Sequence, residues 1–308
     1  MKKNTLFLSI IGILILLIPA GCGFIPRFPG DTIIDHRCLD LSQVPSSVIL
    51  RAKADLVIAY GHTSHGSQLI AGMNGLDAFM GGTGLYDWNG DGSGGALQLR
   101  DEPFTGAADL GSDGSNTNYT AWATATRNYL SDPTNAGVNV IIWSWCGEVS
   151  GATEDNIADD YLANMAQLEL DFPAVHFVYM TGHLDGSGLT GNLHQRNEQI
   201  RAYCRTNGKW LYDFADIESY DPDGNEYLSR YANDGCCYDA DGLNGLETDD
   251  NDPTIPLNDD RNWAVDWQNA HTVDVDWYDC GAAHSVSLNA NRKAYAAWWL
   301  WARLAGWN

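Results

Sequence analysis

The chain has 308 residues and carries 17 basic against 40 acidic side chains, which gives a formal net charge of −23 at pH 7. A surface this acidic repels phosphate backbones, which counts against nucleic acid as a partner. The length suffices for one large domain with a substantial hydrophobic core, and no linker, internal repeat or low-complexity segment divides it.

The first residues have the pattern of an export signal. Lys2 and Lys3 precede an apolar run over residues 6–18, which is too short for a comfortable membrane span and ends in small residues. We therefore expect a signal peptide over residues 1–21 and a mature chain that begins at Cys22. The small residues before this cysteine predict a lipid anchor of the bacterial lipoprotein type, with plain secretion as the alternative. Either route places the protein outside the cytoplasm, and the lipid would be its only membrane contact.

Strands and helices are predicted to alternate along the mature chain. An apolar run at 56–60 predicts a strand, and a helical rhythm from 68 to about 80 predicts a helix after it. Further strands are expected at 138–143, 175–180 and 210–214, and further helices at 44–53, 120–130, 155–169, 193–206 and 288–305. This order predicts an α/β fold: a three-layer sandwich with a mainly parallel sheet and helices on both faces. Residues 22–308 would form one domain with long acidic insertions at about 81–118 and 216–287.

The turn between the first strand and its helix carries the first candidate for chemistry. Gly61 marks this turn, which lies at the carboxyl end of a strand and the amino end of a helix. Free N–H groups and the helix dipole there stabilise a developing oxyanion. Ser64 is therefore the candidate nucleophile, with His62 and His65 in the same turn. The alternative is a turn in which Thr63 or Ser64 only caps the helix.

The carboxyl ends of the next two strands should reach the same rim, because parallel strands end at one edge of their sheet. Cys146 and Gly147 follow the strand expected at 138–143, and His183 follows the strand expected at 175–180. We expect His183 to donate to the substrate or to the oxyanion; the alternative is a histidine bonded to a loop carbonyl. For Cys146, a half-cystine or a buried packing thiol is expected in preference to a reactive thiol.

Asp279 and His284 precede the last helix, and their place in the chain suggests a catalytic pair. A serine early in the chain, with an aspartate and a histidine together before a C-terminal helix, is the order expected for a serine hydrolase. His284 would take the proton from Ser64, and Asp279 would hold the imidazole ring and stabilise its charged form.

This arrangement resembles the SGNH, or GDSL-type, hydrolases, which are exported α/β esterases with a flavodoxin-like three-layer fold. In that family the serine follows the first strand, and Asp-x-x-His lies near the C-terminus. Here Gly61-His62-Thr63-Ser64 stands in place of Gly-Asp-Ser and resembles divergent members that read Gly-His-x-Ser. The Gly-x-Asn-Asp block has its nearest equivalent at Gly147, and four residues instead of two separate the aspartate and the histidine before the last helix.

The resemblance implies an acyl-enzyme mechanism that requires no cofactor. The backbone N–H groups of Ser64 and Gly147, together with His183, would form the oxyanion hole. The other side chains expected at the substrate are His62, His65 and Cys146.

One loop in the first insertion has the pattern of a calcium site. Asp87, Asn89 and Asp91 place oxygen ligands at alternate positions, and Gly92 follows at the sharp turn. The twelfth position is Gln98, where a bidentate Glu is expected, so a solvated turn is the alternative. A calcium ion here would be structural.

The six cysteines beyond Cys22 are an even number in a chain expected to be exported, which predicts one to three disulfides. They are Cys38, Cys146, Cys204, Cys236, Cys237 and Cys280. Neighbouring cysteines do not easily bond to each other, so one of Cys236 and Cys237 is expected to reach Cys280.

We therefore expect an exported, monomeric serine esterase or deacylase that acts on an acylated small molecule or polysaccharide. Of the 12 tryptophans, several lie in the 216–287 segment, where they could stack on sugar rings, so an acetylated glycan is the preferred substrate. Two alternatives stay open. A non-catalytic, calcium-dependent carbohydrate-binding protein on the same scaffold would explain the acidic loops, and a metal-dependent hydrolase would explain the four histidines of the rim.

Overall fold

The computed structural model describes residues 32–111, 120–243, 245–249 and 251–308, which belong to one compact unit, Thr32–Asn308. The expected signal peptide and the lipid site at Cys22 lie outside the described residues. None of the helices in the described ranges has the length and apolar character needed to cross a bilayer.

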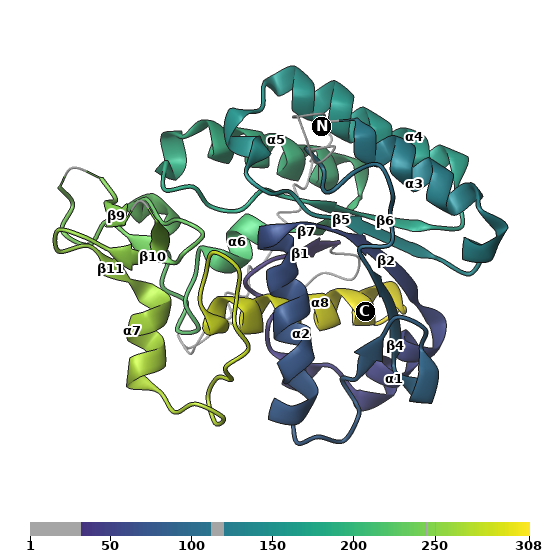
Figure 1. The fold of residues 1–308 in the computed structure, drawn as a ribbon, viewed down its shortest axis with the longest axis horizontal. Coiled ribbons are helices and arrows are strands. Elements are labelled where there is room, and N and C mark those ends of the chain that lie inside the picture. Colours follow the sequence, from purple (N-terminus) through teal and green to yellow (C-terminus); the bar gives the residue numbers. More distant parts are fainter. Residues whose placement is uncertain (1–31, 112–119, 244, 250) are drawn as a thin grey trace, which may run out of the picture. The chain divides into compact units, whose positions relative to one another are not determined.

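A seven-stranded parallel sheet lies at the centre of this unit (Figure 1). Its strands run in the order β1-β7-β6-β5-β2-β4-β3. Their bounds are β1 (Ile33–Ile34), β2 (Val57–Gly61), β3 (Trp88–Asn89), β4 (Leu97–Asp101), β5 (Val140–Trp143), β6 (His176–Met180) and β7 (Trp210–Tyr212). The prediction of an α/β fold with a mainly parallel sheet is confirmed.

Two of these strands lie in the segment expected to be a surface insertion, 81–118. β4 pairs with β2 over four residue pairs, and β3 pairs with β4 at the edge of the sheet. Leu97 and Leu99 of β4 are fully buried, whereas Gln98 and Arg100 between and after them are only half-buried. This alternation is the signal of a strand with one well-buried face, and the surrounding glycines and aspartates hid it.

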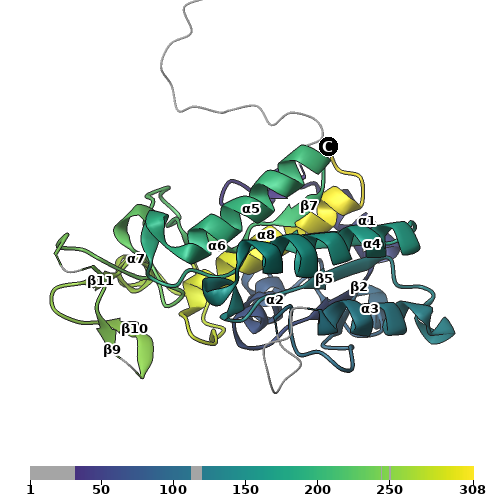
Figure 2. The ribbon, with the colours of Figure 1, turned by 90° about the horizontal axis from the view of Figure 1, so that it is seen from above.

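Helices cover both faces of the sheet (Figures 1 and 2). One face packs against α1 (Ser46–Asp55), α2 (Ser67–Phe79) and α8 (Ser287–Leu304); the other packs against α3 (Ala121–Ser131), the π-helix η6 (Asn156–Leu162), α4 (Ala163–Asp171) and α5 (Asn192–Asn207). Alternate residues of β2 enter the two cores, Ile58 and Tyr60 on one side and Ala59 on the other. The three-layer arrangement follows from this period of two.

The last helix, α8, is buried along almost its whole length, as its tryptophan content predicted. Trp298 and Trp301 are completely buried in the core beneath the sheet, and α8 also packs against α2. Glycine is required at one crossing of these helices, because a Cβ at Gly72 would lie 2.1 Å from the carbonyl oxygen of Ala290. The position of α2, which begins three residues after the candidate serine Ser64, is thereby fixed against α8.

The long segment before α8 forms a small lobe with its own apolar cluster (Figure 1). It contains α6 (Phe214–Glu218), β8 (Cys237–Tyr238), β9 (Thr248–Asp249), β10 (Asp252–Pro256), β11 (Arg261–Asn262) and α7 (Trp263–Ala270). Trp263 is buried in this cluster, with Trp267 and Trp277 packed against it. Trp267 also stacks on His271 at 3.6 Å between ring centroids. These three tryptophans contribute to the packing of the lobe, and a glycan substrate stays a prediction.

The expected disulfides do not form among the described residues. None of the six cysteines there is bonded to another, so the suggested link from Cys236 or Cys237 to Cys280 is wrong. Cys236 lies against Ser285, Cys237 against Asn262, and Cys280 against Asn291. Each thiol therefore has a different polar neighbour instead of another cysteine.

Candidate functional site

The turn after β2 has the geometry expected for a nucleophile at a strand-to-helix junction. The 3-10 helix η2 (Ser64–Gly66) follows the strand and leads directly into α2, and the side chain of Ser64 is exposed at its first position. Glycine is needed at position 66, since a Cβ there would lie 2.1 Å from Ser144 Oγ at the end of β5. This close approach fixes Ser64 at the rim between β2 and β5.

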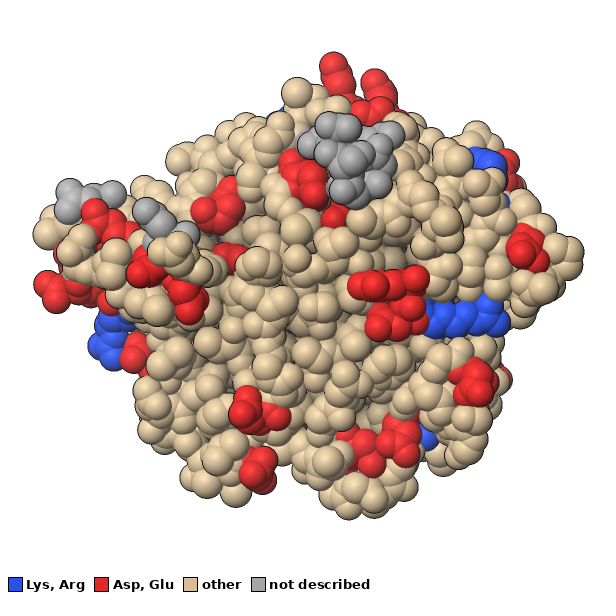
Figure 3. All heavy atoms as spheres, viewed as in Figure 1, with Lys and Arg blue, Asp and Glu red and all other residues tan. Residues whose placement is uncertain are grey.

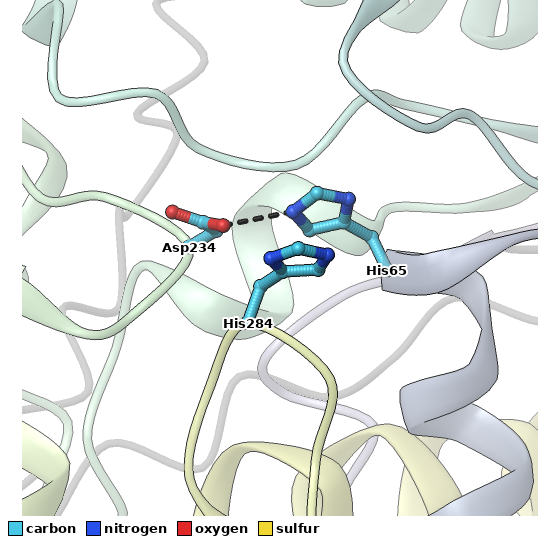
Figure 4. Close-up of side chains that lie close together, drawn as sticks. All are labelled: His65, Asp234 and His284. Carbon is cyan, nitrogen blue, oxygen red and sulfur yellow. Dashed lines mark hydrogen bonds and ion pairs between the residues drawn. The ribbon is translucent and has the colours of Figure 1, made fainter. Parts of the chain in front are cut away.

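Three histidines from three distant segments stack at this rim. The ring of His65 lies between those of His183 and His284, with centroids 3.7 Å and 4.5 Å away and planes only 9° and 16° from parallel. Figure 4 shows His65 and His284 together with Asp234. The expected meeting of the turn after β2, the end of β6 and the loop before α8 is therefore present. His284 is exposed and directly adjoins the residue after Ser64.

His65 is held on both ring nitrogens. Its Nε2 lies 2.8 Å from Asp234 Oδ2, and its Nδ1 lies 3.5 Å from Cys146 Sγ. The carboxylate accepts the proton of Nε2, so Nδ1 is left to accept from the thiol. Burial lowers the pKa of His65 to about 4, and the nearby charge of His284 adds to this effect. His65 is thus a neutral, fixed ring that supports His284.

Asp234 replaces Asp279 as the carboxylate of this site. Asp279 accepts a hydrogen bond from Ser287 Oγ at 2.6 Å, so its carboxylate contacts the start of α8. Asp234, in contrast, has a carboxylate oxygen within 4.8 Å of a ring nitrogen of His284. Sequence reasoning missed Asp234 because it lies in the irregular lobe, where no strand, spacing or motif marks it.

His183 does not have the donor role that was expected of it. Its Nδ1 lies 2.7 Å from the carbonyl oxygen of Leu184, which can only accept, so Nδ1 carries the proton. Burial lowers the pKa of His183, and the neighbouring His65 lowers it further, so the ring stays neutral. The free Nε2 of this neutral ring is an acceptor and cannot donate to an oxyanion. The alternative reading, a histidine bonded to a loop carbonyl, is the one observed.

Two backbone N–H groups were expected to form the oxyanion hole. Among the described residues, the N–H of Ser64 makes no hydrogen bond to another backbone group. The N–H of Gly147 lies against the side chain of Cys146 and lowers the pKa of its thiol slightly, against the larger effect of burial. Gly147 is exposed and precedes the 3-10 helix η5 (Glu148–Gly151), which follows β5. The use of these two N–H groups as oxyanion donors stays a prediction.

A fully buried polar network lies beneath the histidines. Lys293 of α8 and Glu218 of α6 form an ion pair at 2.7 Å, with both side chains completely buried. Lys293 also donates to Gln68 of α2, and Glu218 accepts from the backbone N–H of Leu184. Gln68 in turn donates to the carbonyl of Ala283. The network connects the three segments that carry Ser64, His183 and His284.

Cys146 is half-buried in acidic surroundings. Burial raises the pKa of its thiol, and the carboxylates of Glu148 and Asp109 raise it further. These three side chains bring their ligand atoms within 4.8 Å of one another. A thiolate at this position would face two negative charges, so the thiol is held in its protonated form.

No protein-family model, curated protein or solved structure matches this chain. The chemistry of the site therefore has to be argued from its own geometry.

The donors of the histidine site are not arranged to share a metal ion as they stand. His65, Asp234 and His284 each offer one ligand atom within 4.8 Å of the others. A metal lies close to the plane of the imidazole that binds it, about 2 Å from nitrogen. The rings of His65 and His284 are stacked with their centroids 4.5 Å apart and their planes 16° from parallel. One metal ion therefore cannot lie in the planes of both rings at bonding distance from both.

The suggested calcium loop forms a hydrogen-bonded turn. The side-chain oxygen of Asn89 accepts from the N–H of Asp91, and the carboxylate of Asp91 accepts from the N–H of Ser93. Asp87 lies beside Gly84, where a Cβ would be 3.1 Å from its carboxylate. These contacts fit the alternative of a solvated turn, and calcium binding at this loop stays a prediction.

Proposed function

We propose that the protein is a hydrolase of the SGNH type that cleaves an ester by transferring its acyl group to Ser64. The observation that carries this proposal is the stacking of His284 on His65, the residue directly after Ser64, at 4.5 Å between ring centroids. The exposed residues Ser64 and His284 are thereby brought to the same rim of the sheet from opposite ends of the chain. In this proposal His284 is the general base and Asp234 supports its charged form.

The order of the strands supports this assignment. Five neighbouring strands of the sheet lie in the spatial order β4-β2-β5-β6-β7. If these five are numbered by their order along the chain, the spatial order is 2-1-3-4-5. This is the order of flavodoxin-like sheets, in which ligands bind where the strand order reverses, beyond the carboxyl ends of the first and third strands. Ser64 follows the first of these strands and Gly147 follows the third.

The proposed reaction begins with attack of Ser64 Oγ on the ester carbonyl while His284 accepts the hydroxyl proton. The negative charge on the carbonyl oxygen is stabilised by the N–H groups of Ser64 and Gly147. The imidazolium of His284 then lies within 4.8 Å of Asp234 and gives its proton to the leaving alcohol. A water molecule, deprotonated by His284, hydrolyses the acyl-enzyme and restores the hydroxyl.

A second candidate nucleophile is Cys146, because the line from its Sγ through His65 to Asp234 has the form of a cysteine triad. The carboxylates beside Cys146 oppose this reading, since they hold the proton on the thiol. A serine nucleophile does not need a depressed pKa if a base takes its proton during the attack. We therefore favour Ser64.

The test is hydrolysis of a panel of p-nitrophenyl esters and acetylated sugars by four forms of the full chain. Wild type and Ser47→Ala, an exposed serine on α1, should be equally active, whereas Ser64→Ala should lose on the order of 10³-fold or more in kcat/KM. Cys146→Ala should keep most of the activity. Loss with Cys146→Ala and not with Ser64→Ala would assign the cysteine.

Two further outcomes would favour the other classes of function. Activity that survives Ser64→Ala and disappears with a chelator would favour a metal-dependent hydrolase. Binding of a polysaccharide without any turnover would favour a carbohydrate-binding protein. Export, with a lipid anchor at Cys22 and a monomeric state, completes the proposal, and size-exclusion chromatography and metabolic labelling with a fatty acid would test it.

A further inference from the structure

A small pocket lies on the rim next to the turn that carries Ser64. Its volume is about 160 Å³, and Gly61 and Thr63 form part of its wall. This is below the range for drug-sized ligands, so the pocket suits one chemical group of a substrate and not a whole oligomer. The pocket is part of the same backbone turn as the proposed nucleophile.

Aromatic rings make one side of this pocket. Phe104 stacks on Trp143 with centroids 4.2 Å apart and planes 26° from parallel, and both residues line the cavity. Trp143 packs directly on the turn, since a Cβ at Gly61 would lie 2.3 Å from its ring. The position of the aromatic rings relative to the backbone before Ser64 is therefore fixed.

The other side of the pocket is acidic. Glu102 lines it with a side chain that is 60% exposed, next to the buried His62. The Nε2 of His62 lies 2.7 Å from Asp101 Oδ1, while its Nδ1 lies 3.4 Å from Glu102 Oε1 without forming a hydrogen bond. Glu102 also holds a φ of +46°, a conformation that is costly for a residue with a side chain. The described residues that line the pocket include no Lys or Arg.

We propose that this pocket binds an ammonium group of the substrate. Glu102 and the partly exposed Phe104 line the same pocket, and a carboxylate together with an aromatic ring stabilises a cation by charge and by cation–π attraction. Among the described side chains on the face in Figure 3, carboxylates are widespread and basic groups few, which favours the approach of cations over anions. Binding of an ammonium group does not depend on the proposed function. Only the statement that this ammonium group belongs to an ester bound next to Ser64 rests on it.

The first test is a binding measurement that does not depend on catalysis. Choline and its neutral isostere 3,3-dimethylbutanol are titrated into the full-length Ser64→Ala protein and followed by ligand-observed NMR. The charge should make choline bind about tenfold more tightly, the sum of a cation–π contact and one exposed ion pair. Equal affinities, or no binding of either compound, would overturn the proposal. Tighter binding of neutral diols than of choline would assign the pocket to sugar hydroxyls instead.

A charge-neutral variant locates the site. Glu102→Gln should weaken choline binding about three- to fivefold and leave the isostere unaffected, because the exposed carboxylate contributes a screened ion pair. Glu154→Gln, an exposed glutamate before η6, is the matched control and should change neither affinity. Equal affinities for choline with and without the Glu102→Gln change would contradict the assignment of the ammonium site to this pocket.

Kinetics then separate the subsite from the proposed function. If Ser64 is the nucleophile, wild type should prefer an acetylcholine-type ester over its 3,3-dimethylbutyl isostere by the same factor in kcat/KM, and Glu102→Gln should lower that preference about three- to fivefold. Ammonium binding without ester hydrolysis would support the ammonium site and refute the proposed esterase activity. Ester hydrolysis without a preference for the cationic ester would support the esterase activity and refute the ammonium site.

Discussion

Gln68 donates a hydrogen bond from Nε2 to the backbone carbonyl of Ala283 at 2.5 Å. This contact joins α2, which directly follows the 3-10 helix that carries Ser64, to the loop that carries His284. Lys293 donates to the same glutamine side chain, so Gln68 is held at both ends of its amide. Gln68 is thus one of the buried side chains that connect the segment after Ser64 to the loop before α8.

Replacing this side chain should affect catalysis more than binding. Gln68→Leu removes the bond to Ala283, so we expect kcat to fall roughly 10- to 100-fold with a smaller change in KM, because misplacement by about 1 Å is costly. Steady-state kinetics on the best ester measure this. Gln195→Leu, on the exposed side of α5, is the matched control. Unchanged kcat in Gln68→Leu would show that the amide does not position His284.

The buried ion pair should matter for stability. Lys293→Met leaves Glu218 as an unpaired buried charge and should lower the free energy of unfolding by about 3–5 kcal/mol. The double variant Lys293→Met/Glu218→Gln should recover part of that loss. Lys209→Met, which breaks the partly exposed pair with Glu169, should cost about 1 kcal/mol or less. Urea unfolding gives all three values; similar losses for the two lysine variants would refute the role of burial.

The stack should make folding sensitive to acid. His65 has a pKa of about 4 in the folded protein and about 6.5 when unfolded, so between these values the unfolded chain binds more protons. Stability should therefore fall as the pH drops from about 6.5 towards 4, with about 2 kcal/mol of this loss due to His65 at pH 5. His65→Asn should lose less stability than wild type between pH 7.5 and pH 5. Equal losses in urea unfolding would contradict the low pKa.

The two candidate carboxylates should behave differently. Asp234→Asn removes the charge beside His284 and the acceptor of His65, and should lower kcat by about 10²-fold or more. Asp279→Asn changes only the bond from Ser287 and should cost about 1 kcal/mol of stability or less, with kcat retained. The reverse result would restore Asp279 as the partner of the base.

The predictable parts of this molecule are those with regular local patterns. The apolar runs of β2, β5 and β6 and the tryptophans of α8 predicted the buried parallel sheet and its last helix. β4 was missed because its alternation of leucines is short and lies between glycine-rich turns. Local sequence carried no sign of Asp234, whose position depends on the folding of the whole lobe.

The histidines show the same limit at the level of the site. Their places after β2 and β6 and before α8 predicted that they would meet at one rim. Their roles could not be predicted, because roles depend on which neighbour each ring nitrogen contacts. A carbonyl next to His183 and a thiol next to His65 fix those two rings as supports, and leave His284 exposed for the reaction.

The central claim is that His284 activates the hydroxyl of Ser64 as a nucleophile. Covalent labelling tests this claim most directly. The full-length protein is treated with a fluorophosphonate, and the modified peptide is identified by mass spectrometry. We predict one adduct on Ser64, formed at least about 10²-fold more slowly in His284→Ala. Ester hydrolysis by a protein whose Ser64 stays unmodified, or labelling of Ser64 at the same rate without His284, would contradict the account.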